Sequence, residues 1–387
     1  MRILVIKLIR RAQRSAAARP WFDCVFRVAL LPVFVRLFRL MRLDDMWCCP
    51  VEVSFASVYA KAMKVFSTPA GERRLRNDVI ACFLYYQVSP EEYFMYGFAE
   101  KPHAVRKTYL SNMQRFYAYV AGMGWEPYLT LRDKVEFSKL ARPYFRRETC
   151  PLAGEEDFPA FADFCSRHGR FFLKPNEASL GSGCRVVDHL EDPRPLFDDL
   201  LASGTWIAEE LVVQSAEMEA WNPSSVNTVR INSFRKDGDC LVHTPFLRVG
   251  RKGSIVDNGG AGGVFCSIDA ETGVVATDGY TERGDAFKEH PDSGQAFKGE
   301  QIPHWKELLA LSREIHLSLP EAFRYVGFDF ALTDAGWVLI EGNWGQYVAQ
   351  QVTWERGMKQ DFESLMQVSR LEAIWAYQRL GIRFFAR

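Results

Sequence analysis

The spacing of hydrophobic positions changes near residue 128. Before it, apolar residues recur every three or four positions in the segments 54–68, 72–87 and 103–123, which is the period of an amphipathic helix. Ser89 and Pro90 predict a further helix start, because serine can cap a helix and proline fits its first turn. The first third of the chain is therefore predicted to be helical.

After residue 128, short runs of β-branched and aromatic residues are separated by glycine, asparagine and aspartate, as strands are by turns. The predicted strands are Phe171–Lys174, Cys184–Val187, Thr205–Glu209, Thr228–Phe234, Leu241–Val249, Phe328–Leu332 and Trp337–Glu341. Helices predicted at 155–168, 193–203, 304–317 and 359–380 alternate with them. This order favours an α+β fold behind a helical N-terminal region.

Charge is distributed unevenly along the chain. The net charge is zero, so nothing global indicates a nucleic-acid partner. Residues 1–43, however, hold ten basic residues and a single acid, Asp23, so this segment carries +9 and the remainder −9. Arg36, Arg39 and Arg42 share one helical face, with apolar residues beside them. An arm of this kind fits peripheral contact with an anionic membrane, or equally packing on the acidic remainder of the chain.

Cysteine usage and hydrophobic run length indicate a cytoplasmic protein. The nine cysteines are scattered and form no matched C-x-x-C pairs, which argues against a structural zinc site and favours a reducing compartment. No apolar run reaches the roughly 18–20 residues that a membrane-spanning helix needs.

Two lysines are candidate phosphate ligands. Lys174 ends the strand that begins at Phe171, and a loop of small residues follows, with Ser179, Gly181, Ser182 and Gly183 at its tip. Such a hairpin lets backbone N–H groups approach a polyphosphate, and a lysine adds a point charge. Lys134, some forty residues upstream, is a candidate for the opposite wall. The alternatives are a plain turn and a surface lysine.

An acidic segment follows the strand that begins at Thr205. In Glu209-Glu210-Leu211-Val212, a carboxylate can meet an adenine amino group and backbone amides can meet the ring nitrogens. The alternative is that both glutamates simply end the strand in solvent.

Asp329 and Glu341 predict a metal site. They lie on two strands joined by the turn Thr333–Gly336, twelve residues apart, so they are expected to face each other. Asn343 is two residues beyond Glu341 and is expected on the same face. Two carboxylates and an amide oxygen are ligands that Mg²⁺ prefers, with Mn²⁺ as an alternative, and two unpaired acids in apolar strands would be costly to bury.

In this order the three pieces resemble the ATP-grasp superfamily. Further segments, 227–231, 247–250, 256–264 and 269–273, resemble its sugar-transfer-associated family, and the likeness covers roughly 125–350. The resemblance implies two α+β subdomains that clamp ATP, and an acylphosphate that an amine captures. It also implies a link to assembly of cell-surface polysaccharide or a related conjugate.

The resemblance assigns roles residue by residue. Lys134 and Lys174 would contact the phosphates, Glu210 with the Leu211–Val212 backbone would bind adenine, and the metal would be held by Asp329, Glu341 and Asn343. The acid that binds the ribose stays open among Gln214, Glu217 and Glu219. The implied organisation is a basic arm (1–45), a helical region (46–127), an ATP-grasp domain (128–355, subdomains 128–210 and 211–355) and a C-terminal helix (356–387).

Arg230 and Arg248 resemble the cationic residues that steady the γ-phosphate or the acylphosphate. Each lies in an otherwise apolar strand, so it needs an anionic partner, and a structural ion pair is the alternative. Many ATP-grasp enzymes carry a basic residue two positions before the first magnesium carboxylate. Here that position is Gly327, which strengthens the case for the two arginines.

A glycine-rich segment, Asp257–Gly263, completes the candidate site. It is expected either to cover the substrate or to form a flexible connection, with Asp257 and Asn258 orienting the acceptor nucleophile. Together the residues predict an ATP- and magnesium-dependent ligase that joins a small-molecule carboxylate to an amine. Sugar-linked forms of these substrates are included in the prediction. A sugar or small-molecule kinase and a non-catalytic nucleotide-binding scaffold remain alternatives.

Overall fold

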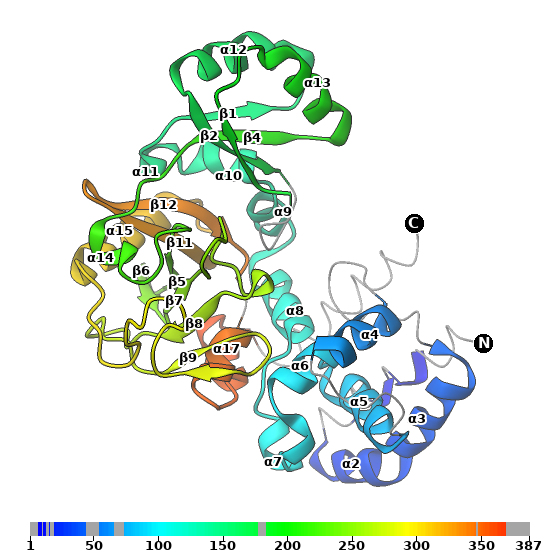
Figure 1. Cartoon of the computed structure of the whole chain (residues 1–387). Helices are drawn as coiled ribbons and strands as arrows, with labels where there is room; N and C mark the ends of the chain where they lie inside the picture. Colours follow the sequence, from blue (N-terminus) through cyan, green and yellow to red (C-terminus); the bar gives the residue numbers. More distant parts are fainter. Residues whose placement is uncertain are drawn as a thin grey trace. The chain divides into compact units, whose positions relative to one another are not determined.

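The chain folds into two compact units (Figure 1). Our computed structural model describes residues 7–9, 11–12, 15, 19–43, 54–65, 73–176, 183–345 and 347–368. The first unit combines Met1–Gly124 with Gln346–Arg387, and the second is Trp125–Gly345. The second unit therefore forms from one continuous stretch, inserted between the two segments of the first.

Among the described residues of the first unit, the regular elements are all helices. Its helices are α2 (Pro20–Val25), the π-helical segment η1 (Phe26–Leu30), α3 (Leu31–Leu40), α4 (Phe55–Val65), α5 (Arg73–Tyr86), α6 (Pro90–Met95), η3 (Phe98–Glu100), α7 (His103–Arg106), α8 (Asn112–Met123), α16 (Val348–Thr353) and α17 (Lys359–Leu365). Stacked and edge-to-face aromatic rings fill the core, among them Phe38, Phe55 and Phe83. The predicted helical front is confirmed.

Capping residues set the helix boundaries in this unit. Ser89 and Glu92 form a capping box at the start of α6, with Pro90 in the first turn, as the sequence predicted. A second box, Ser111 with Gln114, starts α8. The predicted single helix 103–123 is therefore wrong, because the chain breaks after Arg106 and restarts at Ser111.

The returning C-terminal segment is bonded to the N-terminal helices. The buried side chain of Gln351 accepts a hydrogen bond from the Leu110 backbone N–H (2.7 Å) and donates to the Leu110 carbonyl (2.9 Å) and the Tyr96 hydroxyl (3.0 Å). The predicted helix 359–380 is described only to residue 368, where α17 has already ended at Leu365; the rest lies outside the described residues.

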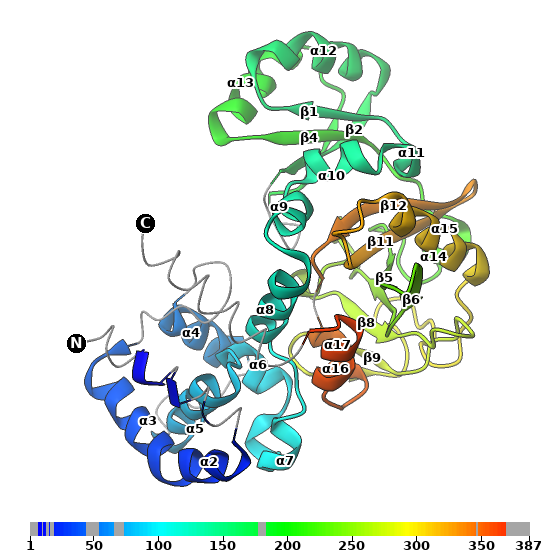
Figure 2. The ribbon, with the colours of Figure 1, turned by 180° about the vertical axis from the view of Figure 1, so that it is seen from behind.

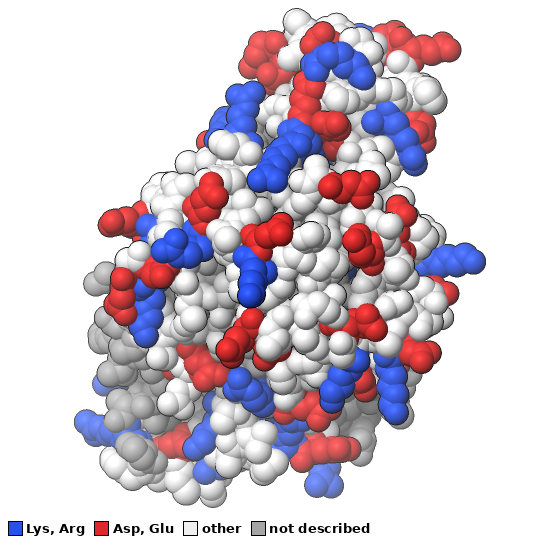
Figure 3. Space-filling model, turned by 90° about the vertical axis from the view of Figure 1, so that its left-hand side faces the viewer, with Lys and Arg blue, Asp and Glu red and all other residues white. Residues whose placement is uncertain are grey.

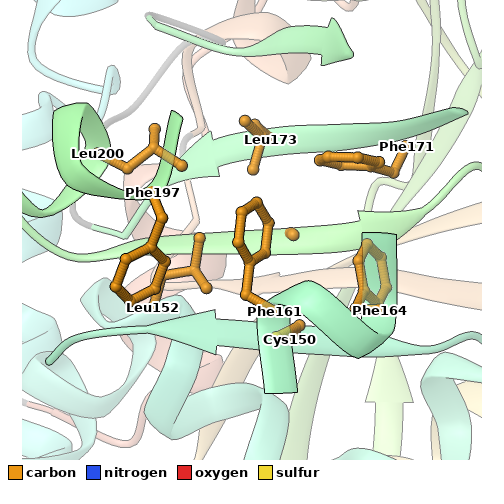
Figure 4. Close-up of a cluster of buried hydrophobic side chains, with 9 residues drawn as sticks. Cys150, Leu152, Phe161, Phe164, Phe171, Leu173, Phe197 and Leu200 are labelled. Atoms are coloured by element: carbon orange, nitrogen blue, oxygen red, sulfur yellow. The ribbon is translucent and has the colours of Figure 1, made fainter. Parts of the chain in front are cut away.

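The second unit begins with three short helices, α9 (Glu126–Arg132), α10 (Lys134–Leu140) and α11 (Arg142–Phe145). A four-stranded antiparallel sheet of order β1-β4-β2-β3 follows, made of β1 (Thr149–Leu152), β2 (Arg170–Pro175), β3 (Arg185–Asp188) and β4 (Trp206–Glu210). The short η4 (Glu155–Asp157), α12 (Phe158–Arg167) and α13 (Pro193–Ser203) complete this layer. Phenylalanines of α12 and α13 pack onto one face of the sheet (Figure 4).

A larger sheet of eight strands completes the unit (Figure 2). Its order is β10-β9-β8-β7-β5-β11-β12, and β6 also pairs with β5. The strands are β5 (Thr228–Lys236), β6 (Asp239–Val242), β7 (Phe246–Val249), β8 (Val264–Ser267), β9 (Gly279–Tyr280), β10 (Ala286–Phe287), β11 (Tyr325–Thr333) and β12 (Gly336–Asn343). Helix α15 (Trp305–Ser318) packs against this sheet, and α14 (Ala216–Glu219) and η5 (Gly259–Ala261) lie in its connections. The predicted α+β class is confirmed.

Two predictions about strands are corrected. The single strand Leu241–Val249 is wrong, because the chain bends at Thr244, with a positive φ of 45°, and Pro245, which lacks an N–H. The bend divides it into β6 and β7, and both pair with β5. β1 was not predicted, since it contains Pro151. Proline is tolerated there because β1 is an edge strand paired only with β4.

The surface view in Figure 3 shows positive and negative side chains interspersed over one face of the molecule. Within the described ranges, no helix has the length and apolar character that crossing a membrane requires. The described cysteines, which exclude Cys48 and Cys49, are all free thiols.

Candidate functional site

The predicted opposition of Asp329 and Glu341 is confirmed, and it depends on a β-bulge. From Thr333↔Gly336 to Phe330↔Leu339 the β11–β12 ladder is regular, and continued unchanged it would set Asp329 opposite Ile340. The register shifts by one residue at this point, so Glu341 becomes the partner of Asp329. The bulge therefore aims the second carboxylate at the first.

Asp329 is fully buried, and both of its carboxylate oxygens accept hydrogen bonds. Arg230, its register partner on β5, binds both carboxylate oxygens through Nε and Nη2, the latter at 2.7 Å from Oδ2. Arg248 Nη2 lies 2.9 Å from Oδ2, and Asn343 Nδ2 donates to the same oxygen at 3.1 Å. Both arginines thus have the anionic partner that their position in apolar strands requires, as the ion-pair alternative expected.

Asp257 joins the same cluster through Thr228 and Arg248. Its Oδ2 accepts hydrogen bonds from the Thr228 backbone N–H (3.1 Å) and hydroxyl, and lies 3.4 Å from Arg248 Nε. Burial raises the pKa of Asp257, and the negative charges of Asp329 and Glu341 raise it further. The charge of Arg248 and the hydrogen bond from Thr228 lower this pKa, but they do not cancel the rise. Burial would lower the pKa of Arg248, but the attraction of the Asp257 and Asp329 carboxylates outweighs burial. The pKa of Arg248 is therefore raised.

Glu341 is half-buried and lies in the field of both predicted lysines. Burial alone would raise its pKa, but the charges of Lys174 and Lys134, together with the hydrogen bond from Asn343, lower the pKa to about 2. Asn343 Nδ2 donates to Glu341 Oε1 at 2.9 Å, so this amide bridges the two carboxylates. Glu341 is therefore ionised at neutral pH.

Lys134 occupies the first position of α10, behind the helix cap Asp133. A cation is unfavourable there, because the helix dipole is positive at this end. Its Nζ donates to the Asn176 carbonyl (2.9 Å), and the Asn176 side chain accepts from the Val135 N–H (3.0 Å). Burial lowers the pKa of Lys134, and Lys174 lowers it further, against the attraction of Glu341.

Lys174, Glu209 and Arg147 form a buried chain of charges that ends at the bulge. Lys174 Nζ lies 2.6 Å from Glu209 Oε1, and Arg147 Nη2 lies 2.8 Å from Glu209 Oε2. Arg147 also donates to the carbonyls of Leu339 (2.6 Å) and Ile340 (3.1 Å). Burial raises the pKa of Glu209, but Arg147 and Lys174 outweigh it, so the pKa is lowered. The Glu209 carboxylate is thus committed to two cations inside the protein.

The segment predicted to bind adenine leaves β4 at Glu210. The Glu210 side chain is exposed and accepts a hydrogen bond from the Glu148 N–H (3.1 Å). Leu211 and Val212 follow, half-buried and outside regular secondary structure. Of the ribose candidates, Gln214 is buried and bonded to Asn222, Ser225 and Asn227, whereas Glu217 and Glu219 are exposed on α14.

The sequence predicted two glycine-containing segments at the site, 179–183 and 257–263. Ser179, Gly181 and Ser182 lie outside the described residues; Gly183 precedes β3 with a φ of 77°. The segment 257–263 is folded, with the Asn258 carbonyl accepting from Ala261 N–H (3.0 Å) and Gly263 N–H (3.1 Å). A Cβ at Gly263 would lie 2.3 Å from the Asp257 carbonyl oxygen, so the turn requires glycine there.

Three residues of the cluster were missed in the sequence. Thr228 was detectable, because it lies two positions before Arg230 on the same strand and therefore on the same face. Arg147 and Asn176 give no local signal, since their partners Glu209 and Lys134 are 62 and 42 residues away.

The cluster suits a small oxygen-ligated cation. Arg230 and Arg248 oppose the carboxylates of Asp257, Asp329 and Glu341, and the charges of Lys134 and Lys174 also act on Glu341. Asp329, Glu341 and Asn343 offer the hard oxygens that Mg²⁺ prefers, although Asn343 must rotate its amide to present Oδ1. Across the described ranges no group of three or more His, Cys, Asp or Glu side chains is arranged to hold a metal.

Residues 195–367, somewhat less than half of the chain, match the family model of the sugar-transfer associated ATP-grasp proteins. Over these residues the chain is an ATP-grasp superfamily member. Within it, the protein is close to the sugar-transfer associated family, as its motifs predicted. The match includes β5, β7, β11 and β12, which carry the cluster around Asp329. A search of curated proteins found no match.

Solved structures match only at low similarity. D-alanyl-alanine synthetase A from Vibrio cholerae O1 biovar eltor is 13% identical, over 62% of this chain and 65% of that chain, with a TM-score of 0.38. The ADP complex of purK, an N5-carboxyaminoimidazole ribonucleotide synthetase, is 10% identical, over 66% of this chain and 58% of that chain, with a TM-score of 0.42.

Proposed function

We propose that this protein is an ATP- and magnesium-dependent ligase that joins a carboxylate to an amine. The observation that carries the proposal is that the charges of Lys174 and Lys134 both act on Glu341 and, with the hydrogen bond from Asn343, lower its pKa to about 2. Glu341 in turn belongs to the cluster of Arg230, Arg248 and Asp329. Fixed cations beside ionised carboxylates are what a metal-bound triphosphate requires.

Each part of the cluster has a proposed task. Lys134 and Lys174 contact the phosphates, with the hairpin tip that ends at Gly183. Glu210 and the Leu211–Val212 backbone bind adenine, and an exposed acid of α14, Glu217, binds the ribose. Glu209 is assigned a different task from the one first expected, because its carboxylate already serves Lys174 and Arg147. It positions Lys174 rather than contacting the base.

Asp329, Glu341 and Asn343 are the residues that would hold magnesium, which would supply charge neutralisation at the phosphate oxygens. Asp329 accepts from Arg230, Arg248 and Asn343 at once. All three meet at Oδ2, so this oxygen can bind a cation only if one of the donors moves away. A guanidinium released from Asp329 remains beside the site, where it can stabilise a phosphate or an acylphosphate.

The proposed reaction has two steps. A carboxylate oxygen of the first substrate attacks the γ-phosphorus of ATP, and ADP leaves with the former bridging oxygen. The amine nitrogen of the second substrate then attacks the acyl carbon and loses a proton, and inorganic phosphate leaves. Asp257 and Asn258 orient the amine, which is consistent with the raised pKa of the buried Asp257 carboxyl.

The proposed substrates are small, with an amino acid or an amino sugar as the amine. The description of the matching family links such proteins to sugar transfer, which supports a role in making a cell-surface polysaccharide or related conjugate. Because ATP is a cytoplasmic substrate, the reaction is proposed to take place in the cytoplasm, including at its membrane face.

Oxygen labelling tests the proposed reaction. The purified chain is incubated with ATP, Mg²⁺ and pools of carboxylates and amines, and ADP and phosphate are measured. For an active pool, a carboxylate labelled with ¹⁸O on both oxygens should transfer one label to the released phosphate. Lys174→Met should abolish ADP release, whereas Lys306→Met, at an exposed position of α15, should leave it unchanged.

Other outcomes identify the alternatives. A phosphorylated acceptor without free phosphate would indicate a kinase. Binding of ATP without release of ADP from any pool would indicate a nucleotide-binding scaffold. Phosphate released without label would contradict the acylphosphate.

A further inference from the structure

Residues 20–40 form a continuous helical run with two faces, made of α2, η1 and α3. The inner face packs on α5: Phe26 lies 5.7 Å from the Tyr85 ring, and Arg39 donates to the Asn77 side chain at 3.2 Å. Packing within the chain, one of the two alternatives raised by the sequence, therefore accounts for this face. It leaves the opposite face unexplained.

The outer face is apolar and exposed. Its large side chains run from 44% exposed at Val25 to 72% at Leu40. In the described part of the chain, five of the thirteen large hydrophobic side chains that are exposed lie in this one run: Trp21, Val25, Val28, Val33 and Leu40. Single exposed hydrophobic residues need no explanation, but a row of them along one helical face indicates a surface that becomes covered.

The charge around this face is positive. Arg19, Arg36 and Arg42 are exposed along the run. Exposed Arg73 and Arg74 begin α5, close to the end of α3 because Arg39 of α3 binds Asn77 of α5. The one acid of residues 19–43, Asp23, accepts a hydrogen bond from the Tyr85 hydroxyl and lies 3.6 Å from His103 Nε2. Asp23 also lies 3.8 Å from Arg27 Nε, so the one acid of the segment is occupied away from Arg19, Arg36 and Arg42.

We infer that the outer face of residues 20–40 docks on an anionic lipid bilayer. The hydrophobic side chains would enter the boundary between headgroups and acyl chains, with Trp21 at the interface, and the arginines would meet lipid phosphates. A row of side chains on the convex side of a helix matches a flat surface and needs no complementary pocket. A second copy of the chain is a poorer partner, because two positive faces repel each other.

This inference is independent of the ligase proposal, and vesicle binding tests it. The full-length protein is sedimented with vesicles of phosphatidylcholine alone, or with about 30% phosphatidylglycerol, the anionic fraction being chosen to give a clear surface potential. We expect binding to the anionic vesicles that weakens as salt is raised. Acyl-chain-brominated lipid should quench tryptophan fluorescence, and the quenching should be lost in Trp21→Phe.

Two double variants separate the apolar and the electrostatic parts. Val28→Asp with Leu40→Asp should weaken binding at least about tenfold, and Arg36→Glu with Arg42→Glu about as much or more. Leu241→Asp, which removes an exposed hydrophobic side chain of β6 in the other unit, is the matched control and should bind as the parent does. Unchanged circular dichroism and thermal unfolding establish that each variant folds.

Three results would overturn the inference. One is equal binding, or none, to neutral and anionic vesicles. Another is an equal loss of binding in Leu241→Asp. The third is concentration-dependent self-association without vesicles that the Val28→Asp and Leu40→Asp pair abolishes, which would assign the face to a second copy.

Discussion

The side chain of Arg230 crosses from β5 over Gly327 of the neighbouring strand β11. A Cβ at Gly327 would lie 3.3 Å from Arg230 Cδ and 3.5 Å from Arg230 Nη1. The missing side chain at 327 thus makes room for the guanidinium that binds Asp329. The positive charge that the sequence lacks at position 327 reaches this carboxylate from the adjacent strand instead.

We predict that the effect of filling position 327 depends on Arg230. Gly327→Val should lower the free energy of unfolding by about 1–3 kcal/mol, because the new side chain crowds a packed guanidinium. In an Arg230→Ala background the same substitution should cost less, since the space has been vacated. Urea unfolding of the parent, the two single variants and the double variant gives the coupling energy.

Arg230→Ala alone should cost about 3–5 kcal/mol, because it leaves a buried carboxylate short of a partner. Equal costs of Gly327→Val in both backgrounds would show that the two positions are not coupled.

The Asp329–Glu341 hairpin was predictable because its information is local. A turn sequence between two hydrophobic runs specifies a hairpin, and acids within such runs need a reason to be there. The bulge that aims Glu341 at Asp329 was not predictable, since its carbonyls bind Arg147, nearly two hundred residues away in the sequence. A regular ladder from the Thr333–Gly336 turn would have placed Ile340 opposite Asp329.

The arginine partners show the same limit. An arginine within an apolar strand predicts some anion, and both arginines have one, but the choice of Asp329 follows from strand order. Arg230 and Asp329 are 99 residues apart and meet because β5 and β11 are neighbours in the larger sheet. The ion pairs of Glu209 could not be predicted for a related reason, because neither Lys174 nor Arg147 lies near it in the sequence.

Glu341→Gln should abolish turnover while preserving the fold. The substitution keeps the size of the side chain but removes the charge that Lys134 and Lys174 attract. Because the pKa of Glu341 is about 2, this carboxylate stays ionised throughout the neutral range, and an acidic limb in the activity profile would have another origin. ADP release and thermal unfolding are measured side by side.

Glu314→Gln, at an exposed position of α15, is the control for the charge change. Turnover retained in Glu341→Gln would mean that the metal site has been assigned to the wrong hairpin.

Glu209 should contribute strongly to stability through its two cations. In Glu209→Gln, Lys174 and Arg147 stay buried without the carboxylate that pairs with both, so the free energy of unfolding should fall by about 3–5 kcal/mol. Asp239→Asn breaks the exposed ion pair with Arg313 and should cost less than about 1 kcal/mol. Similar losses in the two variants would show that the buried chain of charges is not a special support for Lys174.

His316 should make the second unit lose stability in mild acid. It is buried, and its Nε2 donates to the Phe323 carbonyl (2.7 Å), so Nδ1 accepts from the Ser233 hydroxyl (2.7 Å) and the ring is neutral. Burial lowers the pKa of His316 to about 4, from 6.5 in the unfolded chain. Between these values the unfolded chain binds a proton that the folded unit does not, so stability falls as pH decreases from 6.5 to 4.

The expected loss is about 3 kcal/mol over that range, measured by urea unfolding at several pH values. His316→Gln should be less stable at pH 7.5, because it gives up a hydrogen bond, but this part of the pH dependence should disappear. His304→Gln, at an exposed position, should keep the parent profile. If His316→Gln keeps the full dependence of the free energy of unfolding on pH between 6.5 and 4, other groups take up the proton. The neutral imidazole between β5 and α15 would then not limit the acid stability of this sheet.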